Sequence, residues 1–159
     1  MVDLKMPKAY IAAPYTDKSI TKNKSQVYGE IKDSSYINFL DVLDSIAKES
    51  GFNTFLPHRD IHRWGEIYIE PGMVVQKSLE ALNSCDLLIT YPERSAGSNI
   101  ELGWASKLNK KIIILFHENE HPSMMQVGLN GLTDTKILRF RDITDLRFKL
   151  RECLSNFKC

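Results

Sequence analysis

The chain has 159 residues, of which 43% are hydrophobic and 9% aromatic, which is enough for one buried core but too little for two ordinary domains, so we expect a single domain over residues 1–159. Its 21 basic and 20 acidic residues nearly cancel, which argues against nucleic acid or an anionic membrane as a partner. Three cysteines without a C-x-x-C pair argue against a disulfide framework and a zinc site. No apolar stretch is long enough for a membrane span or a signal peptide, so we expect a cytoplasmic protein.

The first part of the chain predicts two strands separated by a helix. Residues 9–13 form an apolar run that ends at Pro14, which is typical of a buried strand, and the polar residues that follow predict a long loop. From Ser34 the apolar residues recur at helical spacing until Gly51 ends the helix. Residues 52–56 predict a second strand, and residues 58–72 an irregular segment of a length that is usually functional or disordered.

The second part continues the alternation of helices and strands. In order, the patterns predict a helix over 74–82, a strand over 85–91, a helix from Ser98, a strand over 111–116, a short helix over 122–129, a strand over 137–140 and an amphipathic helix from about Thr144. Alternating strands and helices favour a parallel sheet covered on both faces. We therefore expect an α/β protein with a five-stranded parallel sheet, a flavodoxin-like variant of the Rossmann fold.

The segment S-A-G-S-N-I-E-L-G-W-A, residues 95–105, carries the strongest functional signal. A strand, a Gly/Ser turn and a helix start follow one another, and the free amides of such a helix end bind anions. Gly97 permits close backbone approach, Ser95 and Ser98 offer hydroxyls, and Glu101 lies one turn into the predicted helix. The alternative is that Ser98 and Glu101 form an S-x-x-E capping box that only satisfies helix-end amides.

Other candidates gather at predicted strand ends. Tyr10 and Tyr15 bracket the carboxyl end of the first strand, where a base could stack, although Tyr10 could equally be an ordinary strand aromatic. His58 and Arg59 end the second strand and suggest polar recognition, or else a solvated loop arginine. Trp64 suggests a wall for a planar ligand, or a cover for the core.

Two histidine pairs have the spacing of metal ligands on a helix, His58 with His62 and His117 with His121. Neither pair falls in a convincing helix, and no H-E-x-x-H occurs. We therefore expect neither a metal nor an organic cofactor.

Several motifs together resemble the nucleoside 2-deoxyribosyltransferase superfamily, from about Lys8 to Phe140. They are A-Y-I-A-A-P-Y, P-H-R-D-I-H-R-W-G, C-D-L-L-I-T-Y-P, G-S-N-I-E-L-G-W-A-S, V-G-L and I-L-R-F. Within it, the chain is most similar to the pyrimidine nucleotide N-glycosidases that cleave CMP and 5-hydroxymethyl-CMP in the mildiomycin and bacimethrin pathways, and among these to the bacimethrin type. The resemblance implies hydrolysis of such a nucleotide to free base and ribose 5-phosphate. A deoxynucleotide hydrolase, a deoxyribosyltransferase and a non-catalytic nucleotide-binding domain remain alternatives.

The resemblance also implies roles for individual residues. Glu101 falls on the catalytic glutamate, which forms a covalent ribosyl intermediate, and Asp86 matches an acidic position of the catalytic site at the third strand, although on its own it could simply bond loop amides. The other matched positions are substrate-binding: Ser95, Gly97, Ser98 and Asn99 in the phosphate loop, Tyr10 and Tyr15 at the base, and His58, Arg59 and Trp64 in a general binding role.

Two further positions bear on selectivity and assembly. At Thr16, members that act on 5-hydroxymethyl-CMP can carry arginine, so the choice between that nucleotide and CMP stays open. Ser123 and Met125 match residues that related nucleotide hydrolases supply from a neighbouring subunit. The resemblance therefore implies at least a homodimer with shared active sites, acting on a small nucleotide.

Overall fold

Five parallel strands form one sheet in the computed structural model, which describes residues 5–157. The strand order is β2-β1-β3-β4-β5, and every neighbouring pair is parallel. In sequence order the strands are β1 (Lys8–Ala12), β2 (Asn53–Phe55), β3 (Leu87–Thr90), β4 (Lys111–His117) and β5 (Thr135–Phe140). This confirms the expected flavodoxin-like α/β fold.

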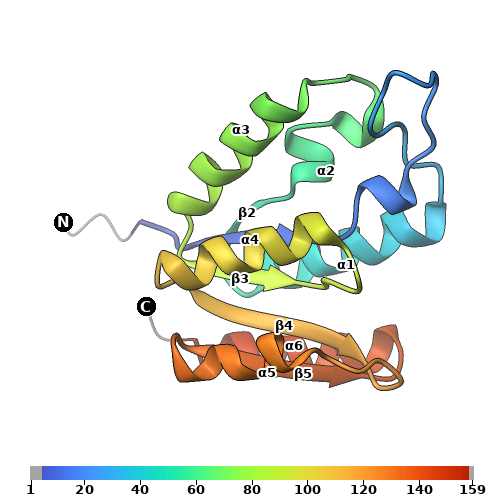
Figure 1. Cartoon of the computed structure of the whole chain (residues 1–159). Helices are drawn as coiled ribbons and strands as arrows, with labels where there is room; N and C mark the ends of the chain where they lie inside the picture. The colour runs from blue at the N-terminus through green and yellow to red at the C-terminus, as the bar shows by residue number, and fades with distance from the viewer. Residues whose placement is uncertain (1–4, 158–159) are drawn as a thin grey trace.

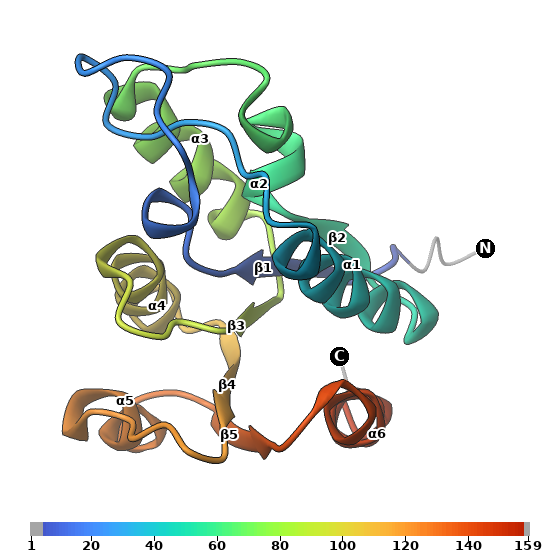
Figure 2. The same cartoon turned by 90° about the vertical axis from the view of Figure 1, so that its right-hand side faces the viewer.

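Helices cover both faces of the sheet (Figures 1 and 2). The helices are α1 (Ser34–Glu49) and α6 (Ile143–Ser155) on one face, α3 (Pro71–Asn83), α4 (Ala96–Lys107) and α5 (Met124–Gly128) on the other, and the short α2 (Pro57–Asp60) directly after β2. No helix within residues 5–157 has the length and apolar character needed to cross a bilayer.

The strands divide their side chains between two cores, as the two-residue period of a strand requires. Ala9 and Ile11 of β1 point into the core beneath α1 and α6, whereas Tyr10 and Ala12 point into the core beneath α3 and α4. All four residues of β3 are buried, which explains why this strand appears in the sequence as a continuous apolar run rather than an alternating one. The position of Tyr10 matters most for function, because it places a phenol under α4.

Two local expectations are wrong. The segment 58–72 is irregular only in part: Pro57 occupies the first position of α2, where its fixed φ suits a helix, a single 3-10 turn follows at Arg63–Gly65, and α3 already begins at Pro71. Helix α4 begins at Ala96 rather than at Ser98, because the Ser95 side chain accepts a hydrogen bond from the Ser98 amide and so caps the helix.

The long loop after β1 is tied to the turn after α2. Ile20 and Glu30 form an antiparallel bridge, and the Ile31 amide donates to the Trp64 carbonyl at 3.0 Å. Gly65 has φ +96°, and a Cβ there would lie 2.4 Å from the Glu30 Cα, so only glycine allows this approach. The loop is thereby held over the carboxyl end of the sheet.

Candidate active site

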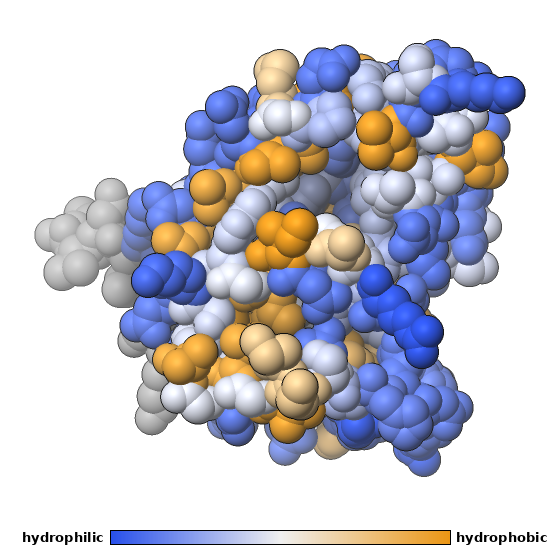
Figure 3. Space-filling model, viewed as in Figure 1, coloured by the Kyte–Doolittle hydropathy of each residue, from blue (hydrophilic) through white to orange (hydrophobic). Residues whose placement is uncertain are grey.

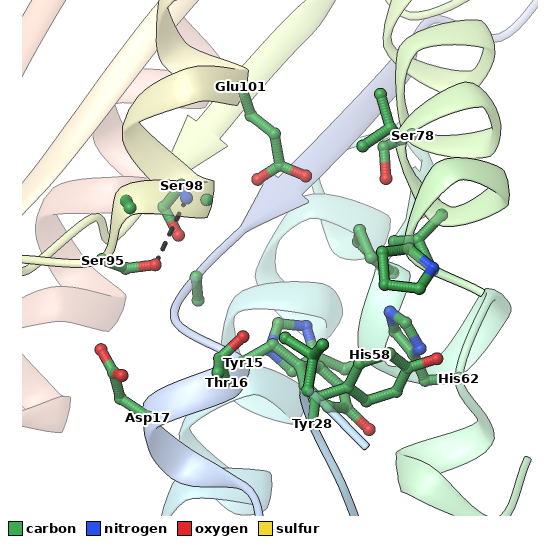
Figure 4. A pocket seen from close by; sticks show the side chains of 18 of the residues that line it. Tyr15, Thr16, Asp17, Tyr28, His58, His62, Ser78, Ser95, Ser98 and Glu101 are labelled. Carbon is green, nitrogen blue, oxygen red and sulfur yellow. Dashed lines mark hydrogen bonds between the residues drawn. The ribbon is translucent and has the colours of Figure 1, made fainter. Parts of the chain in front are cut away.

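A cavity of about 470 Å³ opens at the carboxyl end of β1, between α3, α4 and the loop that follows β1 (Figure 4). The residues that line it come from five segments of the chain and are Ala13, Tyr15, Thr16, Asp17, Val27, Tyr28, Pro57, His58, His62, Pro71, Val74, Val75, Ser78, Arg94, Ser95, Ala96, Gly97, Ser98 and Glu101. Ligands bind at this edge in open parallel sheets generally.

Glu101 projects from the second turn of α4 into the cavity (Figure 4). The buried phenol of Tyr10, on β1, donates a hydrogen bond to Glu101 Oε1 at 2.6 Å. Because Ser95 caps the helix, the capping box between Ser98 and Glu101 is absent. The Glu101 carboxyl is therefore free to face a ligand rather than its own helix end.

The surroundings of Glu101 favour the protonated, neutral form of its carboxyl. Burial raises the pKa of Glu101 to about 7, and the hydrogen bond from Tyr10 opposes that rise. A carboxyl with this pKa is ionised in about half of the molecules at neutral pH. Such a perturbed group in a cavity is typical of a functional site.

The N-terminal end of α4 forms one end of the cavity (Figure 4). The Ser98 side chain is only 2% exposed, and its hydroxyl has no hydrogen-bond partner among the described residues. A Cβ at Gly97 would meet only Ser95 Oγ, at 3.9 Å, so the glycine leaves the space beside the helix amides open. Unpaired amides, the helix dipole and a free hydroxyl together suit an anion.

Aromatic side chains line the cavity at the carboxyl end of β1. Tyr15 and His58 line the cavity with their ring centroids 5.0 Å apart, and His58 Nε2 lies 3.0 Å from the Pro14 carbonyl oxygen, to which it donates. Burial lowers the pKa of His58 to about 4, and the bond to Pro14 opposes that shift, so the ring is neutral at pH 7. Thr16 also lines the cavity.

Asp86 lies outside the cavity lining, which corrects its assignment to the catalytic site. It immediately precedes β3, and its Oδ2 accepts a hydrogen bond from the Lys8 amide at 2.8 Å. Glu101 lines the cavity at the carboxyl end of β1, whereas Asp86 is not among the lining residues. Asp86 thus joins the amino ends of β1 and β3, as the simpler sequence interpretation allowed.

Arg59 and Trp64 also lie outside the cavity lining, contrary to the binding role expected of them. Arg59 Nη1 pairs with Asp44 Oδ1 at 3.0 Å, and its Nε with Asp60 Oδ1 at 2.8 Å. The Trp64 side chain packs against the core beneath α1. Arg59 therefore braces α2 against α1, and Trp64 helps to hold the loop after β1 through its carbonyl.

Asn99, Ser123 and Met125 do not reach the cavity of their own chain. Asn99 Nδ2 donates to the Ser95 carbonyl at 2.7 Å, and its Oδ1 accepts from Gln126 Nε2 at 2.8 Å, so it braces the start of α4 against α5. Ser123 caps α5 in a capping box with Gln126. The Met125 side chain is 75% exposed.

Several lining residues were not among the sequence candidates. Val74 and Ser78 are four residues apart on α3 and so share its cavity-facing side, a relation visible in the sequence once α3 is placed beside α4. His62 lies four residues after His58, and Tyr28 reaches the cavity from the long loop. That loop carries no periodic signal from which its side-chain directions could be predicted.

No protein-family model matches the chain, and no curated protein does. Among solved structures, the chain is similar to a Clostridium botulinum CMP N-glycosidase, BcmB, with 21% identity and a TM-score of 0.67 over 90% of this chain and 97% of that one. It is also similar to BlsM, with 18% identity and a TM-score of 0.72 over 94% and 90%. A 2-deoxyribosyltransferase from Bacillus psychrosaccharolyticus matches at 18% identity and a TM-score of 0.54 over 95% and 92%. At these identities the similarity shows that the chain has the fold of these proteins.

Proposed function

We propose that this protein hydrolyses the N-glycosidic bond of a pyrimidine ribonucleoside 5′-monophosphate, CMP or 5-hydroxymethyl-CMP, to free base and ribose 5-phosphate. The observation that carries the proposal is the placement of Glu101: a half-buried carboxyl, held by Tyr10, faces a cavity that ends at a helix terminus suited to an anion. The sequence motifs and the fold shared with a CMP N-glycosidase support the choice of substrate. The resemblance to the bacimethrin-type enzymes belongs to this proposal as well.

In the proposed reaction Glu101 attacks the anomeric carbon. The C1–N1 bond breaks through an oxocarbenium-like state, its electron pair leaves with the base, which gains a proton, and a bond forms between C1 and a Glu101 oxygen. Because Tyr10 binds Oε1, Oε2 is the oxygen left to react. Water then attacks C1, transfers a proton to solvent and releases the Glu101 carboxylate. The 5′-phosphate, held by the α4 amides with Ser95 and Ser98, keeps the sugar over Glu101 throughout.

The proposal is tested by incubating the protein with CMP and separating the products by chromatography. We expect free cytosine and ribose 5-phosphate in equal amounts. Turnover of dCMP alone would indicate a deoxynucleotide hydrolase, and transfer of the sugar to a second added base would indicate a transferase. If CMP binds without releasing cytosine, the domain only binds nucleotides and the proposal is wrong.

The pH dependence of hydrolysis should follow the ionisation of Glu101. The carboxylate is the reactive form and the pKa of Glu101 is about 7, so kcat/KM for CMP should rise as the pH increases through 7. Tyr10→Phe removes the hydrogen bond that lowers this pKa. The rise should therefore move to higher pH, with kcat/KM at pH 7 about tenfold lower, as expected for one hydrogen bond to a charged group.

Tyr91→Phe is the matched control, since it removes a half-buried phenol hydroxyl outside the cavity lining. It should leave the pH profile in place. If the profile of Tyr10→Phe also coincides with that of the native protein, Tyr10 does not set the ionisation of Glu101.

The face that carries the cavity mouth is also apolar. Figure 3 shows apolar residues gathered over α3, α4 and α5, and the side chains of Met124 and Met125 are 86% and 75% exposed. Val75 is both exposed and part of the cavity lining, so a molecule bound to this face would cover the mouth. We accordingly propose that the active form is at least a homodimer, in which Ser123 and Met125 approach the cavity of the partner.

Met125→Asp places a charge on this face and should convert the protein to monomers with reduced CMP hydrolysis. Light scattering gives the molecular mass, and the cytosine assay gives the activity. Phe148→Asp is the matched control, because Phe148 is equally apolar and 69% exposed but lies on α6, on the other face of the sheet. A Met125→Asp monomer with full activity would contradict the shared site.

A further inference from the structure

His62 is a polar side chain of the cavity, at the end away from Ser98, with no hydrogen bond to any residue from 5 to 157. It lines the cavity just after α2 and packs against Tyr15 and Tyr28, with ring centroids 4.3 and 4.7 Å away. Its Nδ1 is fully covered and has no hydrogen-bond partner among residues 5–157. Its Nε2 has no partner in that part of the chain either, yet it is not among the covered atoms, so Nε2 is the nitrogen that a ligand can meet.

His58 differs from His62 in that one of its ring nitrogens has a fixed hydrogen-bond partner. Its Nε2 donates to the Pro14 carbonyl, which can only accept, so the proton of the neutral ring is fixed on Nε2. Burial lowers the pKa of His62 to about 4, so its ring is neutral at pH 7 as well. No described residue bonds either nitrogen of His62, so the protein leaves its proton free to occupy either of them.

The position of His62 relative to a bound nucleotide follows from the proposed function, on which this inference rests. With the phosphate at Ser95 and Ser98 and C1 at Glu101, the base extends toward the opposite end of the cavity, where Figure 4 shows His62. In a pyrimidine ring C4 lies opposite N1, so the substituent on C4 goes deepest. The remaining wall there is apolar and consists of Val27, Pro71, Val74 and Val75.

The hydrogen-bonding character of that substituent distinguishes the two common pyrimidines. Cytosine presents an amino donor at the 4-position, whereas uracil presents a carbonyl acceptor. Two other polar groups nearby are already engaged: the Tyr28 hydroxyl donates to the Ile69 carbonyl at 2.8 Å, and His58 Nε2 donates to Pro14. His58 Nδ1 has no partner among the described residues, but it is fully covered and so does not meet a ligand. Without a partner, the buried 4-substituent would lose the hydrogen bonds it makes in water.

We propose that His62 Nε2 binds the 4-substituent of the base, accepting from the amino group of cytosine in one tautomer and donating to the carbonyl of uracil in the other. A histidine nitrogen that can either donate or accept a hydrogen bond does not discriminate between these bases. The protein should therefore hydrolyse UMP as well as CMP. His62 is, in this account, a residue that binds the base but admits both pyrimidines.

Steady-state kinetics with CMP and UMP test the consequence. We expect kcat/KM for the two nucleotides to agree within about tenfold, the equivalent of one hydrogen bond. His62→Leu should lower kcat/KM for both by about tenfold or more, chiefly through KM, while His62→Asn, whose amide both donates and accepts, should retain more activity with both. A UMP value more than tenfold below that of CMP, or an unaffected His62→Leu variant, would overturn the proposal.

Nitrogen chemical shifts of His62 test the tautomer directly and do not depend on turnover. The Glu101→Ala variant, labelled with 15N-histidine, is titrated with CMP and then with UMP. We expect an unprotonated Nε2 in the CMP complex and a protonated Nε2 in the UMP complex. The same tautomer in both complexes, or no change on binding, would contradict the role of His62. Because this is a binding measurement, its result is separate from whether CMP is cleaved at all.

Discussion

Glu101→Ala should lower kcat for cytosine release from CMP by at least about a thousandfold, because removing a nucleophile deletes the covalent route. The dissociation constant for CMP should change by less than about tenfold, since the phosphate and the base are held by other groups. Chromatographic rates together with calorimetric titration separate the two effects. A variant with near-normal turnover would rule out Glu101 as the nucleophile.

Glu101→Gln is the sharper version of this variant, because it keeps the shape of the side chain and can still hydrogen-bond Tyr10. The pKa of the Glu101 carboxyl is raised to about 7 in the folded protein, from an ordinary value of 4.5. Its protonated form therefore contributes to the stability of the folded state below about pH 4.5, and this contribution is lost as the pH rises through 7, where the carboxylate forms. Glu101→Gln should therefore be inactive and yet melt at a higher temperature than the native protein at pH 8. Inactivity caused by misfolding would instead lower the melting temperature.

Cytidine, which lacks the 5′-phosphate, should be hydrolysed with a kcat/KM about a thousandfold below that of CMP. The phosphate is expected to meet the amides at the start of α4 and the unpartnered Ser98 hydroxyl. Two hydrogen bonds to a charged group contribute about 4 kcal/mol together, which corresponds to about a thousandfold. Comparable rates for cytidine and CMP would show that the phosphate is not used for binding.

Ser98→Ala tests the same anion site within the protein. It should raise KM for CMP about tenfold and leave cytidine hydrolysis unchanged, because only the phosphorylated substrate meets that hydroxyl. Ser106→Ala, near the other end of α4 and outside the cavity lining, is the matched control and should affect neither substrate. Equal effects of Ser98→Ala on both substrates would count against a phosphate site.

The fold could be predicted from the sequence because burial on both faces leaves a strong local signal. The apolar runs over β3 and β4 and the helical spacing within α1 report directly on which residues are buried. The four-residue α2 was missed because so short a helix has no periodic pattern. The exact start of α4 was missed because both Ser95 and Ser98 are good caps, and only their packing selects Ser95.

The site could be predicted where its residues are adjacent in sequence, as in Ser95, Gly97 and Glu101, but less well where it depends on distant partners. Arg59 forms an ion pair with Asp44 of α1 instead of lining the cavity. The motif around Arg59 gives no sign of this distant partner. Asp86 matches an acidic position of the motif but bonds the Lys8 amide, because a motif match does not say at which end of a strand the side chain lies.

The stereochemistry at C1 tests the central claim most directly. CMP is a β-nucleotide, so attack by Glu101 followed by attack of solvent inverts C1 twice and retains its configuration. Turnover of CMP in water containing methanol, followed by proton NMR of the methyl riboside 5-phosphate formed, reads the configuration without interference from mutarotation. A covalent Glu101 intermediate predicts the β-anomer, whereas the α-anomer would show direct attack of solvent on CMP and contradict the mechanism.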